Sequence, residues 1–192
     1  MNVTQQYLNG NYGTDKYDLG YMEHFYDTEF LKIQDTCENF LEIGCWQGES
    51  IKLWQDYFTS KTNIIGIDIN DFPSSDITKI IDDGYSEKIV NKFDDNFFDV
   101  VLDDGPHTYQ SFLDVMLKYF PKIKPGGILI IEDIIRPWLD MGVTEEQQSY
   151  LKTYAKEIGY TLIEEYDMTK KQKTQRLYQQ WKTGLFILKL TK

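Results

Sequence analysis

The sequence predicts an α/β protein with a mostly parallel sheet. Short apolar runs that end in glycine or aspartate alternate along the chain with longer amphipathic segments. This alternation is typical of strand–helix–strand units, in which helices pack against a sheet. The length of 192 residues favours a single domain covering 1–192. We expect its first part, residues 1–35, to be a lead-in followed by a helix.

Each expected element has a local signal in the sequence. The expected strands are the apolar runs at 39–44, 63–68, 77–81, 97–103, 128–131, 160–166 and 185–190. The expected helices lie at 21–32, 49–58, 86–93, 109–120 and 144–158. Residues 1–20 are polar and contain glycines, so a loop is expected there, and residues 124–127 are typical of a turn. Since no helix is evident between the last two strands, we expect them to pair as a hairpin at one edge of the sheet.

The composition excludes several classes of partner. The formal net charge of -11 argues against a broad basic surface for nucleic acid or for an anionic membrane. No apolar run approaches the ~20 residues of a membrane span, and the polar start lacks an apolar signal segment. We therefore expect a cytoplasmic protein that binds a small molecule, with no nucleic acid or membrane partner. The sequence leaves a homo-oligomer open.

The first expected strand leads into a loop with two glycines. In open α/β sheets, ligands bind beyond the carboxyl ends of the strands. Gly44 and Gly48 allow the backbone to approach a ligand and to turn sharply into the next helix. Trp46 stands where a dinucleotide-binding GxGxxG motif has its second glycine, which argues against a pyrophosphate ligand. A tight turn without a ligand is the alternative.

Acidic residues follow the next two strands. Asp68 ends the second strand, where a carboxylate can accept hydrogen bonds from both hydroxyls of a ribose; capping the following segment is its alternative role. Asp83 is a candidate partner for an adenine amino group, with Asp82 as its rival. Tyr85 could stack on the same ring.

These segments together resemble a known family across residues 38–135. The matching motifs are Phe40-Leu41-Glu42-Ile43-Gly44, Gly66-Ile67-Asp68, Phe98-Asp99-Val100-Val101 and Lys124-Pro125-Gly126-Gly127. They resemble class I S-adenosylmethionine-dependent methyltransferases. The resemblance implies a Rossmann-like three-layer sandwich, with a seven-stranded sheet and an antiparallel strand near the C-terminus. It also implies S-adenosyl-L-methionine as cofactor, and the expected binding residues are Glu42, Gly44, Gly48, Asp68, Asp83 and Asp103.

Four carboxylates are expected at the ends of the fourth and fifth strands. Asp103 and Asp104 end one strand, and Glu132 and Asp133 end its expected neighbour. Like charges this close need a counter-ion, and Mg²⁺ prefers oxygen ligands. We predict Asp104, Glu132 and Asp133 as metal ligands, with solvated loop acids as the alternative. Because adjacent residues on a strand point to opposite faces, Glu132 and Asp133 can share a metal only if the strand has already ended.

His107 is the candidate general base. It lies three residues after Asp104, and an imidazole can take a proton near neutral pH. A metal held by Asp104 would polarise an acceptor hydroxyl and make that proton easier to remove. A packing or helix-capping histidine is the alternative.

This second cluster narrows the resemblance. Asp104-Gly105-Pro106-His107 with Glu132-Asp133 is similar to the metal-dependent deoxysugar O-methyltransferases of macrolide tailoring, of the mycinamicin and tylosin type. That similarity implies Mg²⁺ on Asp104, Glu132 and Asp133, with His107 as base. The lead-in Tyr12-Gly13-Thr14-Asp15-Lys16 with Gly20-Tyr21 is similar to the family's pre-core motif, which helps to close over cofactor and substrate. Pro106 departs from the family's usual serine.

The sequence therefore predicts an S-adenosylmethionine-dependent O-methyltransferase that methylates a hydroxyl of a sugar or sugar-bearing small molecule. Tyr12, Tyr21 and Trp138 are candidate walls of the acceptor site. Catechol-type methylation and a non-catalytic cofactor-binding protein are the alternatives. An NAD-dependent oxidoreductase is disfavoured because GxGxxG is missing.

Overall fold

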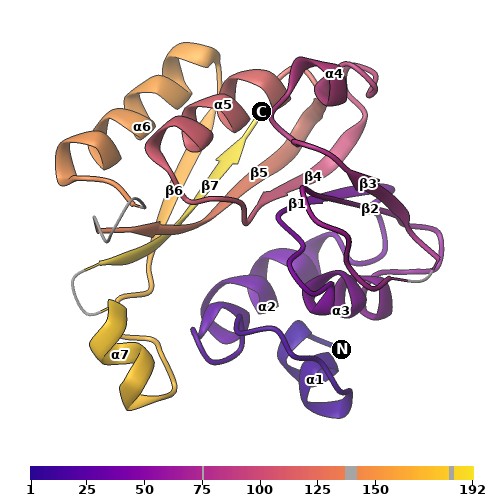
Figure 1. The fold of residues 1–192 in the computed structure, drawn as a ribbon, viewed down its shortest axis with the longest axis vertical. Helices are drawn as coiled ribbons and strands as arrows, with labels where there is room; N and C mark the ends of the chain where they lie inside the picture. The colour runs from indigo at the N-terminus through magenta and orange to yellow at the C-terminus, as the bar shows by residue number, and fades with distance from the viewer. Residues whose placement is uncertain (75, 137–141, 182–183) are drawn as a thin grey trace.

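A seven-stranded sheet forms the centre of the molecule (Figure 1). The computed structural model describes residues 1–74, 76–136, 142–181 and 184–192. The strand order within this part is β3-β2-β1-β4-β5-β7-β6. The strands are β1 (Asn39–Ile43), β2 (Asn63–Asp68), β3 (Thr78–Ile81), β4 (Phe98–Asp103), β5 (Ile123–Ile135), β6 (Leu162–Asp167) and β7 (Leu185–Thr191). The pairs from β3 through β5 are parallel, whereas β7 is antiparallel to both β5 and β6. The predicted fold class and terminal hairpin are confirmed.

Helices cover both faces of the sheet. On one face lie α4 (Glu87–Val90), α5 (Tyr109–Tyr119) and α6 (Glu145–Ile158) (Figure 1). On the other face lie α1 (Val3–Asn9), η1 (Met22–Tyr26), α2 (Asp27–Glu29), η2 (Phe30–Lys32) and α3 (Glu49–Tyr57). Each face has its own cluster of buried apolar side chains. The architecture is therefore three layers, with helices above and below one sheet.

Aromatic side chains join the lead-in to the sheet. The Trp54 ring on α3 is fully buried, and its centroid lies 5.0 Å from that of Tyr26, 5.1 Å from Phe30 and 5.9 Å from Phe40. Because Tyr26 and Phe30 are four residues apart, they face the same side of the helical segment. This packing holds residues 22–32 against one face of the sheet.

The C-terminal part of the chain also holds the lead-in. The Lys189 ammonium on β7 donates to Glu29 at 2.7 Å and to Glu164 at 2.6 Å. In the β6–β7 connection, the Lys173 N–H donates to the Asp18 carbonyl at 2.8 Å, and its ammonium pairs with Glu23. Residues 18–29 are thereby tied to segments near the other end of the sequence.

Three local expectations were wrong. Residues 1–20 contain α1, which begins at an Asn2 N-cap whose side chain and that of Gln5 satisfy each other's backbone N–H groups. The β6–β7 connection contains α7 (Gln175–Trp181). β5 begins at Ile123, so residues 124–127 lie within the strand as an irregular stretch where its register against β4 shifts.

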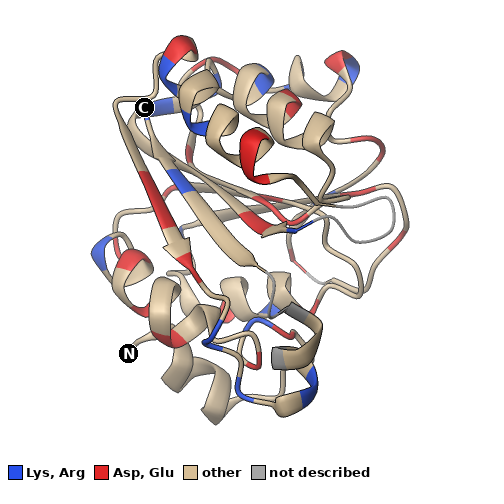
Figure 2. Cartoon of the chain, turned by 90° about the vertical axis from the view of Figure 1, so that its left-hand side faces the viewer, with Lys and Arg blue, Asp and Glu red and all other residues tan. Residues whose placement is uncertain are grey.

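Charged residues are mixed over the outer helices. In the view of Figure 2, acidic and basic positions alternate on the helices and form no single basic face. In the part of the chain that the structure describes, no helix has both the length and the apolar character required to cross a bilayer.

Candidate functional site

A cavity of about 730 Å³ opens beyond the carboxyl ends of β1, β2, β4 and β5. This is the edge at which open α/β sheets bind ligands, and the volume suits a cofactor together with a small acceptor. The cavity wall brings together Gly44, Asp68, Asp83, Asp104, His107, Glu132 and Asp133 from the predicted site. Residues 13–15, Leu19 and Tyr21 of the lead-in form the facing wall.

Glycine is required at Gly44 by the packing of two loops. Its φ is +87°, and a Cβ there would lie 2.1 Å from the Asp104 carbonyl oxygen. The β1 loop and the β4 loop therefore touch each other through bare backbone in the cavity wall. Gly48, with φ +75°, is the N-cap residue of α3 and does not line the cavity.

Asp68 organises the loop after β1. Its Oδ2 accepts the backbone N–H groups of Cys45 and Trp46, each at 2.9 Å, and its Oδ1 accepts the Asn70 N–H at 2.8 Å. A carboxylate has about four lone-pair positions, so three are used by the backbone. The predicted partner of two ribose hydroxyls is thus also the anchor of the glycine loop, with one position left for a ligand.

The two rival acids after β3 differ in their partners. The Lys88 ammonium pairs with Asp82, whereas Oδ1 of Asp83 accepts the Tyr85 N–H at 2.9 Å. Both acids line the cavity, and the ion pair of Asp82 favours Asp83 for a ligand. The Tyr85 hydroxyl donates to the buried Asp103 carboxylate, which fixes the tyrosine ring in the cavity wall. Burial raises the pKa of Asp103 to about 7 although the Tyr85 bond lowers it.

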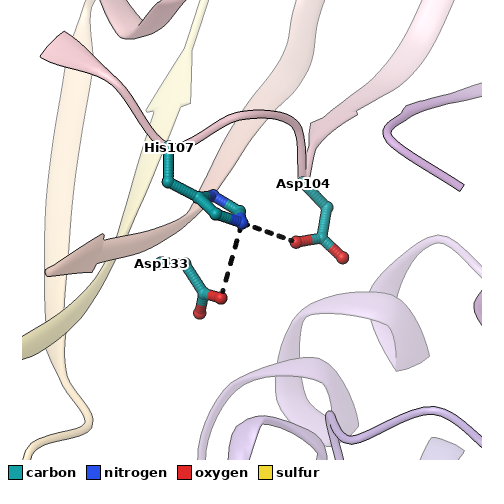
Figure 3. A group of neighbouring side chains, drawn as sticks. All are labelled: Asp104, His107 and Asp133. Carbon is teal, nitrogen blue, oxygen red and sulfur yellow. Dashed lines mark ion pairs between the residues drawn. The ribbon is translucent and has the colours of Figure 1, made fainter. Parts of the chain in front are cut away.

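Asp104, His107 and Asp133 converge at the other end of the cavity (Figure 3). The His107 Nε2 lies 3.8 Å from an Asp104 oxygen and 3.7 Å from an Asp133 oxygen. One ligand atom from each residue lies within 4.8 Å of the others, a spacing that could hold a metal ion. All three side chains are partly exposed to the cavity.

A bulge in β5 turns Asp133 toward this group. Ile131 pairs with Leu188 and Ile134 with Phe186, so β5 has one extra residue there, and Asp133 has φ +52°. The strand continues to Ile135, so the condition stated for two neighbouring acids to face one side is met by a bulge that breaks the alternation and not by the end of the strand. Both neighbouring acids line the cavity as a result.

Glu132 is engaged by residues that the sequence reasoning did not select. Its buried carboxylate accepts from the Lys16 ammonium and from the Tyr26 hydroxyl. The Tyr21 hydroxyl donates to Asp133 in the same way. Lys16 and Tyr21 belong to the pre-core motif noted in the sequence, but no acidic partner was predicted for either residue. Of the candidate acceptor walls, Tyr21 lines the cavity, Tyr12 bonds Asp56 outside it, and Trp138 lies outside the described residues.

The acids around Lys16 set the electrostatics of the site. Burial lowers the pKa of Lys16, but the carboxylates of Asp104, Glu132 and Glu42 outweigh burial and hold that pKa well above its usual value. Burial raises the pKa of Asp15 to about 6 and that of Glu42 to about 7, despite the opposing effect of Lys16 on both. The single ammonium of Lys16 does not balance the carboxylates that surround it. Carboxylate oxygens with such an excess of negative charge suit a hard divalent cation.

The comparisons with known proteins agree with this geometry. Residues 41–134 match a family model described as a methyltransferase domain. Demethylmacrocin O-methyltransferase of Streptomyces fradiae is 28% identical over 144 residues, which are 69% of this chain and 35% of that protein. Mycinamicin VI 2''-O-methyltransferase of Micromonospora griseorubida is 29% identical over 144 residues, 66% of this chain and 35% of that protein. The chain thus spans about a third of the length of these curated relatives.

A solved structure supports the same fold. The MycE methyltransferase of the mycinamycin biosynthetic pathway, in complex with Mg and SAH, superposes with a TM-score of 0.66 at 21% sequence identity. The match covers 89% of this chain and 49% of that one. This chain therefore shares the fold of that methyltransferase, matches a methyltransferase domain across residues 41–134, and is similar in sequence to the two O-methyltransferases named above.

Proposed function

We propose that this protein transfers a methyl group from S-adenosyl-L-methionine to a hydroxyl of a sugar or sugar-bearing small molecule. One observation carries the proposal: the same cavity is lined by Gly44 and Asp68 at one end and by Asp104, His107 and Asp133 at the other. The alignments with demethylmacrocin and mycinamicin VI O-methyltransferases cover about two thirds of this chain, and both of those enzymes are named for transfer to oxygen.

The cofactor would lie along the β1 and β2 ends of the cavity. Gly44 would face it from the cavity wall, the fourth lone-pair position of Asp68 would accept a ribose hydroxyl, and Asp83 would accept the adenine amino group. The Tyr85 ring, held by Asp103, would face the adenine. Glu42 and Gly48 do not line the cavity, so any contribution they make to binding passes through the loop that they support.

Asp104 and Asp133 would hold a divalent ion such as Mg²⁺, and Glu132 would join them. MycE, whose fold this chain shares, is described in complex with Mg. When bound, the ion would polarise the acceptor oxygen and lower the pKa of its hydroxyl. A vicinal diol suits such a site because two adjacent oxygens can approach one ion.

His107 would act as the general base. Its Nε2 faces the space between Asp104 and Asp133, and the His107 carbonyl accepts the Gly142 N–H at 2.8 Å, which fixes the turn that carries the ring. The imidazole would take the hydroxyl proton as the acceptor oxygen bonds to the methyl carbon and the carbon–sulfur bond breaks. The products are a methyl ether, S-adenosylhomocysteine and a protonated His107.

The lead-in completes the site in this proposal. Residues 13–15, Leu19 and Tyr21 cover the cavity opposite the strand ends, and the Tyr21 hydroxyl holds Asp133. We infer that residues 1–35 belong to the same domain as the sheet, since their side chains complete its cavity.

Methyl transfer from labelled S-adenosylmethionine tests the proposal. We expect transfer to glycosylated acceptors and not to simple catechols, and about 10²–10⁴-fold slower turnover in His107→Ala with S-adenosylhomocysteine affinity nearly unchanged. His24→Ala, the other histidine of the chain, is the matched control and should keep full turnover. Transfer to catechols alone would assign the alternative chemistry. Equal turnover in His107→Ala would remove His107 as the base.

A further inference from the structure

We propose that the Lys16 ammonium is a built-in counter-cation of the acidic site, and that it moves from Asp104 and Glu132 to Glu42 when a divalent cation binds. Lys16 thereby sets the metal affinity of the site. The inference rests on the metal site of the proposed function, and its test can fail independently of methyl transfer.

The position of Lys16 carries the first step. Its Nζ lies 2.6 Å from Asp104 Oδ2 and also donates to Glu132 Oε2. The residue is 1% exposed, so water and salt screen its charge only weakly. Two of the three predicted metal ligands therefore already share a cation that comes from the chain itself.

A divalent ion on Asp104, Glu132 and Asp133 would lie beside this ammonium. Two cations that share the same carboxylate oxygens repel each other, and the repulsion is strong where water is excluded. The ion can use Glu132 fully only if Lys16 gives up its bond there. Lys16 is thus a competitor of the metal unless another acceptor receives it.

Glu42 is such an acceptor. Its Oε1 lies 3.9 Å from Lys16 Nζ, and its side chain is fully buried at the end of β1. Among the described residues, no donor reaches either Glu42 oxygen in good hydrogen-bond geometry, although the Ser50 and Trp54 side chains lie close enough to lower the pKa of Glu42. A buried carboxylate with such incomplete hydrogen bonding is costly, so the nearby Lys16 ammonium stabilises it by moving into contact. A shift of about 1 Å brings an ammonium from this distance to hydrogen-bond contact, and the flexible lysine stem permits it.

Glu132 can spare Lys16 because it has a second donor. The Tyr26 hydroxyl donates to Glu132 Oε1, the oxygen that Lys16 does not use. Tyr26 is fixed among the rings of Phe30 and Trp54 and does not depend on Lys16 for its position. Glu132 therefore keeps its orientation toward the cavity when the ammonium leaves.

The exchange predicts opposite effects for its two ends. Lys16→Met removes the competitor, so Mn²⁺ should bind about tenfold tighter or more. Glu42→Gln removes the charged acceptor, so Lys16 stays on the ligands and Mn²⁺ should bind about tenfold weaker. In the double variant Glu42→Gln should change the affinity little beyond Lys16→Met alone, because nothing remains to be exchanged.

Calorimetric titration of the full chain with Mn²⁺, without cofactor or acceptor, measures these affinities. Lys173→Met is the control, since Lys173 pairs with Glu23 on the same lead-in but away from the carboxylate cluster; it should stay within about twofold of wild type. Thermal unfolding with and without Mn²⁺ provides a second readout. Lys16→Met should be less stable without metal and should gain more from it than wild type.

Three results would overturn the proposal. One is unchanged or weaker Mn²⁺ binding in Lys16→Met, with no larger thermal gain. Another is an equal loss of affinity from Glu42→Gln in the wild-type and Lys16→Met backgrounds, which would show that Glu42 acts on the ion directly. The third is no Mn²⁺ binding by any of the variants. Methyl transfer is measured separately. If the protein transfers methyl groups but Lys16→Met leaves the Mn²⁺ affinity unchanged, only this inference is rejected. If the Mn²⁺ affinities change as predicted but no methyl transfer occurs, only the proposed function is rejected.

Discussion

Asp68→Ala should both destabilise the protein and weaken cofactor binding. The substitution removes the acceptor of three backbone N–H groups. Trp46 is 81% exposed and Asn70 is also exposed, so water can replace the carboxylate at these two positions. Cys45 is 2% exposed, and its N–H is left buried without a partner.

The cost follows from the Cys45 N–H. A buried donor that loses its acceptor costs about 1–3 kcal/mol, and the two exposed donors add little. The expected loss is therefore about 2 kcal/mol, which for a chain of this length lowers Tm by about 4–8 °C. The freed loop also no longer holds Gly44 against the β4 loop, so S-adenosylhomocysteine should bind about tenfold weaker or worse.

Thermal unfolding and calorimetric titration with S-adenosylhomocysteine measure the two effects. Asp71→Ala is the matched control, because Asp71 lies three residues away, is 78% exposed and pairs only with the surface residue Lys79 among the described ion pairs. Its loss should cost less than about 1 kcal/mol. If Asp68→Ala left Tm and affinity unchanged, or if Asp71→Ala reproduced both losses, the assigned role of Asp68 would be wrong.

Further expectations concern the metal ligands, the core and the thiols. Asp104→Asn should shift the Mg²⁺ dependence of methyl transfer to about tenfold higher concentrations, and a superimposable titration would remove Asp104 as a ligand. Trp54→Ala should cost about 3–5 kcal/mol in chemical denaturation because the ring is fully buried among aromatics; a loss under about 1 kcal/mol would contradict this packing. Burial raises the pKa of Cys37 to about 12 and that of Cys45 well above its usual value, so both thiols stay protonated at neutral pH. Ellman's reagent should therefore react with them only after unfolding, and fast reaction of the native protein would refute their burial.

The residues at strand ends could be predicted because the alternation of strands and helices fixes them. Gly44, Asp68 and Asp104 each follow an apolar run, and parallel strands bring such positions to one edge of a sheet. The pattern of strands and helices therefore predicted the edge of the sheet at which the cavity lies, together with most of the acids that line it. It also predicted the antiparallel end of the sheet from the missing helix signal, although the short α7 lies in that connection.

The pairing within the acid cluster could not be predicted in the same way. Whether Glu132 faces a metal or a lysine depends on Lys16, which is 116 residues away and carries no signal of burial in its own neighbourhood. The bulge at Asp133 depends on one extra residue opposite β7, which no periodicity in β5 reveals. The capping pair Asn2 and Gln5 was visible in the sequence, but the glycines that follow concealed the helix it begins.

The ties that hold the lead-in have a consequence for biosynthesis. Lys16 bonds Asp104 and Glu132, which lie 88 and 116 residues further along the chain. Glu23 bonds Lys173, 150 residues further on, and Glu29 bonds Lys189, 160 residues further on. The lead-in is therefore synthesised well before the residues that hold it, and it cannot dock until they have been made. The wall that the lead-in forms over the cavity therefore closes only after residue 189 has been translated.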